Sequence, residues 1–134
     1  RQTKYQKKLD AEIKRLGIGD RIHFLQGVPN DLLAAIYNQA EAFIYPSRYE
    51  GFGIPIIEAI QSGLPVVAAM GSCLEEAGGP DCLYVGPDDV DGNAAAILSA
   101  IENRKEIVSK SQRYVKRFEN QDVASQVLEI YNKV

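Results

Sequence analysis

The sequence predicts an α/β fold built around one parallel β-sheet. Several short runs of apolar residues have the length and composition of strands buried in a sheet. Segments with apolar residues at helical spacing lie between these runs, and strands that alternate with helices are typical of parallel sheets. The 134 residues are 46% hydrophobic and 25% charged, as in an ordinary globular domain. We therefore expect residues 1–134 to form a single domain.

The first part of the chain contains two predicted helices and two predicted strands. These are a helix over 5–16, a strand over 21–25, a helix that begins at residue 30 and a strand over 42–45. Gly17 provides the stop of the first helix, and Asn30 can cap the second. The last of these runs is apolar without interruption and closed by Pro46, which is typical of a strand buried on both faces.

The rest of the chain continues the alternation of strand and helix. The predicted elements are a helix over 55–61, strands over 65–69 and 82–85, a helix over 72–77, and helices near 91–103, 105–118 and 122–133. Pro55 suits the first turn of its helix, where a missing N–H costs nothing. Ser62 and Gly63 end that helix.

Composition and charge argue against several classes of function. The formal net charge is −3 and the basic residues are scattered, which argues against nucleic acid as a partner, because phosphate-backbone binding needs a basic surface. Cys73, Cys82 and the single His23 lack the spacing of metal ligands, so we expect no metal ion. No apolar run approaches the ~20 residues of a membrane span. We expect a cytoplasmic protein.

Two carboxylates flank a glycine-rich turn in the sequence PSRYEGFGIPIIE over residues 46–58. Glu50 precedes the turn and Glu58 follows it. This loop comes after a predicted strand, and ligands of open parallel sheets bind where the strands end. The glycines let a ligand approach the backbone closely, and the helix that begins near Pro55 offers unsatisfied N–H groups to a phosphate.

The two carboxylates need a different explanation, because a phosphate repels them. A carboxylate can accept two hydroxyl hydrogen bonds side by side, which suits the vicinal diols of sugars. A ligand made of a sugar, a diphosphate and a ribose would satisfy Glu50, the helix start and Glu58 together. The residues alone also allow a structural role, since a glutamate near a helix N-terminus is favourable in any protein.

The same stretch resembles a known family. The two glutamates form an E-x7-E element that begins inside PSxxEGFG, and the letters GxPVV follow at 63–67. This run resembles the nucleotide-sugar site of the retaining GT-B glycosyltransferases, a group that includes bacterial mannosyl-, glucosyl- and N-acetylglucosaminyltransferases. Motifs at 24–28, 72–76 and 83–89 also fit, so the resemblance runs from about residue 9 to the end. It implies the Rossmann-like C-terminal half of a GT-B fold, a parallel sheet with flanking helices.

The resemblance implies an enzyme of the hexosyltransferase type, which transfers a sugar from a nucleotide-diphosphate sugar to an acceptor without a metal ion or another cofactor. It assigns the ribose hydroxyls of the nucleotide to Glu58. It makes Glu50 the catalytic residue, in contact with hydroxyls of the donor sugar.

The remaining donor contacts follow from the same resemblance. The backbone of Gly51, Phe52 and Gly53 is expected to face the diphosphate and the sugar. Val28 matches the position that lies along the nucleobase. Ile54 matches the apolar position beneath the base and ribose.

The chain departs from this family in what it lacks. The N-terminal domain, which binds a sugar, lipid-linked or other acceptor, is absent. So are the first two strands of the C-terminal domain and the Arg/Lys pair that neutralises the leaving diphosphate. Transfer depends on stabilising that leaving group, so we expect the chain alone to be inactive. The family's strand order is 3-2-1-4-5-6, which leaves a gap between the strands at 21–25 and 42–45 unless they pair directly or the missing piece comes from elsewhere.

The sequence leaves other functions open. One alternative is a non-catalytic binding or regulatory module that pairs with a separate chain carrying the acceptor domain. A nucleotide-sugar isomerase of similar two-domain fold is a third option. Basic residues over 104–117 are interpreted as the solvated face of a helix, although such a face can meet anionic lipid at the cytoplasmic membrane surface.

Overall fold

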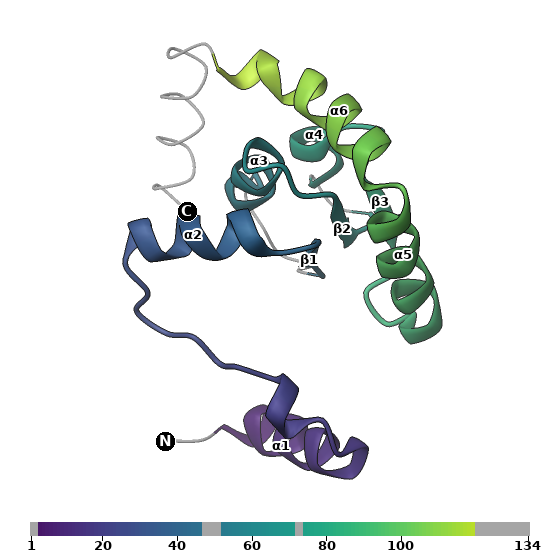
Figure 1. Ribbon diagram of the computed structural model, residues 1–134. Coiled ribbons are helices and arrows are strands. Elements are labelled where there is room, and N and C mark those ends of the chain that lie inside the picture. Colours follow the sequence, from purple (N-terminus) through teal and green to yellow (C-terminus); the bar gives the residue numbers. More distant parts are fainter. Residues whose placement is uncertain (1–2, 47–51, 72–73, 120–134) are drawn as a thin grey trace. The chain divides into compact units, whose positions relative to one another are not determined.

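The computed structural model describes residues 3–46, 52–71 and 74–119 (Figure 1). The chain divides into two compact units, Arg1–Asn30 and Asp31–Val134, and each is described by itself. The interpretation of residues 1–134 as a single domain stays a prediction.

The first unit is built around the helix α1, which spans Lys4–Leu16. The hydroxyl of Thr3 accepts a hydrogen bond from the N–H of Gln6 at 3.0 Å and so caps the start of the helix. At the other end Gly17 is left-handed, with φ 67°, and its N–H bonds carbonyls of the last turn. The predicted helix and its glycine stop are confirmed. The short 3-10 helix η1, Gly19–Arg21, follows.

The predicted strand over 21–25 is wrong. Residues 22–26 lie in neither helix nor strand, and Phe24 and Leu25 are each 58% exposed. A β-rich run forms a strand only against a neighbour that pairs with its N–H and C=O groups. None of the described strands pairs with this run, so its composition alone does not make it a strand.

The second unit contains a parallel sheet with the order β1-β2-β3. The strands in the described part of the chain are β1, Phe43–Tyr45, β2, Val66–Ala69, and β3, Leu83–Val85. Phe43 pairs with Val66, and Val67 pairs with Leu83. This sheet confirms the predicted α/β class and three of the predicted strands.

The central strand is buried and the first one is not. All residues of β2 are buried between its two neighbours. Among the described strands β1 pairs with β2 alone, and Ile44 in its middle is 37% exposed. The prediction that this strand is buried on both faces is therefore wrong. An apolar run reports the hydrophobicity of a strand but not how many neighbours it has.

Helices pack on both faces of the sheet (Figure 1). From residue 30 onward they are α2, Asn30–Gln39, α3, Ile54–Gln61, α4, Leu74–Gly78, α5, Val90–Glu102, and α6, Arg104–Val115, which continues into the 3-10 helix η2, Lys116–Phe118. Helices α3 and α4 share a core cluster with Val66 and Ala68, whereas α5 packs with Val67 on the other face. The predicted helix near 122–133 lies outside the described residues.

Helix α6 is fastened at both ends by side-chain hydrogen bonds. The guanidinium of Arg104 donates to the carbonyls of Ala40 and Gly63, each at 3.2 Å, just before β1 and β2 begin. One end of α6 therefore lies at the amino ends of these strands. Near the other end, the hydroxyl of Tyr114 donates to the carbonyl of Glu76 in α4 at 2.7 Å.

Candidate functional site

The candidate site begins where β1 ends. The next described element after Tyr45 is α3, whose N-cap is Gly53. The start of α3 therefore lies at the carboxyl ends of the strands, the edge where parallel sheets bind ligands. Glu50 and Gly51 lie outside the described residues, so their assigned roles stay predictions.

Gly53 determines how α3 begins. Its backbone is left-handed, with φ 87° and ψ 39°, a conformation that residues with a Cβ rarely adopt. The residue is also buried, and an added Cβ would lie 3.1 Å from both Cβ of Ala77 and Cδ2 of Leu74 in α4. The sequence interpretation assigned this glycine to the close approach of a ligand. Packing against α4 gives a second and independent reason for it.

The first turn of α3 presents backbone N–H groups. The carbonyl of Gly53 accepts the N–H of Ile56 at 3.0 Å and that of Ile57 at 3.4 Å. Pro55 is the second residue of the helix and has no N–H to satisfy. Ile54, as the first helical residue, has no intrahelical acceptor for its N–H. Together with the helix dipole, this arrangement suits an anion.

The ring of Phe52, just before α3, packs against an aromatic residue of the 3-10 helix η2. The Phe52 ring meets that of Phe118 edge-on, with the centroids 5.3 Å apart and an interplanar angle of 85°. Phe118 in turn lies 6.2 Å from the ring of Tyr114 at the end of α6. The sequence interpretation missed this support. Two aromatic residues one helical turn apart were its signal, but nothing local indicated which surface they cover.

Glu58 stands on the exposed side of α3. Its helix buries Ile56, Ile57, Ala59 and Ile60, and the glutamate side chain is exposed. Its carboxylate acts on Tyr37 of α2: burial is the larger cause that raises the pKa of this tyrosine, and the negative charge of Glu58 adds to it. A solvent-facing carboxylate beside a tyrosine, in the helix that begins at the glycine turn, can accept hydroxyl hydrogen bonds from a ligand.

The structure brings only some of the predicted site residues together. Phe52, Gly53, Ile54 and Glu58 all belong to the turn and helix that follow β1 in the second unit. Val28 belongs to the first unit and is half-buried there, so its predicted contact with the nucleobase stays a prediction.

The described residues contain no group of three or more His, Cys, Asp or Glu side chains that could hold a metal ion. Cys82 is buried, and its thiol donates to the carbonyl of Gly78 at 3.4 Å. Burial is the main cause that raises its pKa to about 11, so this thiol is a core group rather than a reactive one. Within the same residues, no helix is long and apolar enough to cross a membrane.

The family model described as Glycosyl transferases group 1 matches residues 2–121. The chain belongs to this family. It is 37% identical over 128 residues to the MMP alpha-(1->4)-mannosyltransferase of Mycolicibacterium hassiacum. This alignment covers 90% of the chain and 31% of that protein. It is 35% identical over 113 residues to the O-antigen chain mannosyltransferase B of Escherichia coli, covering 82% of the chain and 30% of that protein.

Solved structures of glycosyltransferases share the fold. Sucrose-phosphate synthase from Thermosynechococcus elongatus superposes with a TM-score of 0.78 at 26% identity, over 96% of this chain and 34% of that one. The Anabaena protein HepE, solved in complex with UDP-glucose, superposes with a TM-score of 0.77 at 27% identity, over 97% of this chain and 37% of that one. The chain therefore has the fold of part of a GT-B glycosyltransferase and spans about a third of the length of its relatives.

Proposed function

We propose that this chain is the donor-binding part of a retaining glycosyltransferase, which transfers a hexose from a nucleotide-diphosphate sugar to an acceptor. Family membership supports a glycosyltransferase. Two relatives named as mannosyltransferases, and a structural neighbour solved with UDP-glucose, support a hexose on a nucleotide diphosphate as the donor.

The observation that carries the proposal is the arrangement along α3. The helix starts at the carboxyl end of β1 with a left-handed glycine and an N–H that has no acceptor in the helix, and Glu58 is exposed about one turn later. Four residues of helix from Ile54 to Glu58 rise about 6 Å. A diphosphate at the helix start and a ribose beside the carboxylate would occupy that interval, each next to a group of matching chemistry.

The other groups act around this axis. Glu50 would contact hydroxyls of the donor sugar as the catalytic residue, and the backbone of Gly51 and Phe52 would face the diphosphate and sugar. Val28 and Ile54 would contact the nucleobase and ribose. No metal or other cofactor takes part in this proposal.

Positive groups for the leaving diphosphate and the acceptor site would come from segments beyond this chain. The chain alone would then bind the donor without transferring it. We also propose a cytoplasmic location.

The proposal is tested by calorimetric titration of UDP, GDP and ADP against the intact protein and its Glu58→Ala variant. One nucleotide diphosphate should bind, and the variant should lose about ten- to a hundredfold in affinity, because hydrogen bonds to a charged group contribute about 1.5–3 kcal/mol. Glu102→Ala removes another exposed glutamate, on α5, and is the matched control, which should bind as the parent does.

Three outcomes would count against parts of the proposal. Binding of no nucleotide diphosphate would contradict the donor site, and an equal loss in the control would contradict the role of Glu58. Tight binding of a nucleotide-diphosphate sugar by a longer protein that also carries the acceptor-binding domain, without any transfer to water or an acceptor, would favour the alternative of a non-catalytic module.

A further inference from the structure

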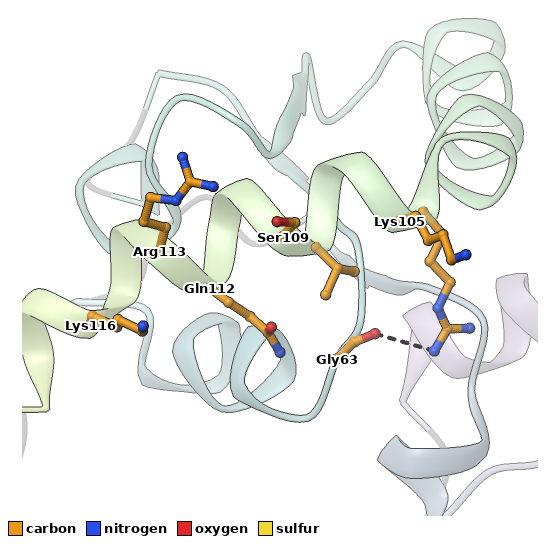
Figure 2. A pocket seen from close by; sticks show the side chains of 8 residues that line it. Gly63, Lys105, Ser109, Gln112, Arg113 and Lys116 are labelled. Atoms are coloured by element: carbon orange, nitrogen blue, oxygen red, sulfur yellow. Dashed lines mark hydrogen bonds between the residues drawn. The ribbon is translucent and has the colours of Figure 1, made fainter.

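A basic groove lies beside α6, on the side where Arg104 bonds Gly63 after the end of α3, and we name it the α6 groove (Figure 2). Its volume is about 740 Å³. The main lining residues are Arg104, Lys105, Ser109, Gln112, Arg113 and Lys116, with Gly63 after α3 at its edge. Lys105, Ser109, Gln112 and Lys116 recur at intervals of three or four, so they form one face of the helix. From Lys105 to Lys116 this face extends about 16 Å along the axis.

The α6 groove concentrates positive charge in an acidic chain. The whole chain has a formal net charge of −3, yet the described residues that line the groove include four cationic ones and no carboxylate. The ion pair on α6 among the described residues joins Lys110 to Glu106, and neither residue lines the groove. Asp81 lines a neighbouring hollow that Arg113 also borders, so the charge of Lys105 and Lys116 is the less compensated.

The groups in the groove are hydrogen-bond donors suited to an acceptor-only anion. Arg104 and Gln112 donate to main-chain carbonyls, which fixes them in place, and those acceptors are neutral, so the Arg104 charge is kept. Ser109 is exposed and adds a hydroxyl between the two lysines. Guanidinium and ammonium groups with hydroxyl donors are the usual partners of phosphate.

The shape favours a soluble ligand over a membrane surface. A helix that inserts in a bilayer interface exposes large apolar side chains. On α6 the apolar Ile107 and Val115 are buried against the core, and Val108 is half-buried. The concave groove with cations near both ends instead fits a compact molecule that carries negative charge at more than one point.

The groove is separate from the candidate donor site. Gly53 starts α3 at the carboxyl end of β1, whereas Gly63 follows the other end of the same helix, before β2. A helix of eight residues separates the two points by about 12 Å. We propose that the α6 groove is a second anion-binding site, which takes a soluble ligand bearing two or more phosphate groups.

The test is calorimetric titration of the full chain with sodium tripolyphosphate. The parent should bind, and affinity should fall between about 50 and about 200 mM salt, because the contacts are electrostatic. The double variant Lys105→Gln/Lys116→Gln should bind at least about tenfold more weakly, since two charge-assisted contacts are lost. Lys4→Gln/Lys8→Gln on α1 makes the same change in net charge at exposed positions and should bind as the parent does.

Other outcomes would overturn the proposal. One is no binding of tripolyphosphate at millimolar concentration, and another is an equal loss in the α1 variant, which would indicate attraction to net charge alone. A third is cosedimentation with phosphatidylglycerol vesicles that depends on the two groove lysines without any binding of tripolyphosphate, which would indicate a membrane surface. Circular dichroism of each variant verifies the fold. Unchanged titration of nucleotide diphosphate by the groove variant would keep this site distinct from the donor site.

Discussion

Replacing Gly53 by alanine is expected to destabilise the fold by about 2–5 kcal/mol. The left-handed backbone, with φ 87°, costs a residue with a Cβ about 1–2 kcal/mol. The new methyl group would also lie 3.1 Å from Cβ of Ala77 and Cδ2 of Leu74, and overpacking costs about 1–3 kcal/mol. The end of the leucine side chain can rotate away. The alanine Cβ is fixed to the backbone of α4, so one of the two helices must shift.

Gly63 supplies a matched control at the other end of the same helix. It has the same φ of 87°, but an added Cβ would meet nothing within 4 Å. Gly63→Ala should therefore lose only the backbone part, about 1–2 kcal/mol. Urea denaturation followed by far-ultraviolet circular dichroism measures both variants against the parent. Equal destabilisation would refute the packing argument, and a loss below about 0.5 kcal/mol in both variants would refute the backbone argument as well.

Three further changes have expected outcomes. In the intact enzyme, Glu50→Ala should leave nucleotide-diphosphate affinity nearly unchanged and lower turnover more than donor binding, which calorimetry and steady-state kinetics separate; an affinity loss as large as that of Glu58→Ala would contradict the assignment. Unfolding free energy should fall by up to about 2–3 kcal/mol as pH rises from 9 to 11, because the Cys82 thiol ionises first in the unfolded chain, and a decline equally steep in Cys82→Ala would assign the effect to other groups. Phe118→Ala should cost about 1–3 kcal/mol in urea denaturation and weaken nucleotide binding through Phe52, whereas an unchanged urea midpoint would show that this ring contact contributes nothing.

Much of the fold could be predicted because its signals are local. Gly17 ends α1, as its position after the last apolar residue of the helical pattern suggested. Pro55 stands in the first turn of α3, and the helix ends at Gln61 with Ser62 as its C-cap, as expected. Each of these features depends on a few neighbouring residues, which the sequence displays directly.

The failures all concern partners that are distant in sequence. Residues 21–25 have strand composition, but they pair with none of the described strands, and Ile44 is exposed because β1 has one paired neighbour among those strands. In the candidate site, the predicted helix over 55–61 is confirmed as α3, and the role of Glu58 stays a prediction. The support of Phe52 by Phe118 was missed, since only tertiary structure brings these two rings together.

The contacts of Arg104 have a consequence for the kinetics of folding. Its two acceptors, Ala40 and Gly63, are separated from it by 64 and 41 residues of chain. Contacts of such long range close large loops and tend to form late. Interactions that are absent from the transition state act mainly on the unfolding rate. The hydrogen bonds of Arg104 are therefore expected to form after the strands have paired. Their chief effect is to slow unfolding of the sheet rather than to speed its folding.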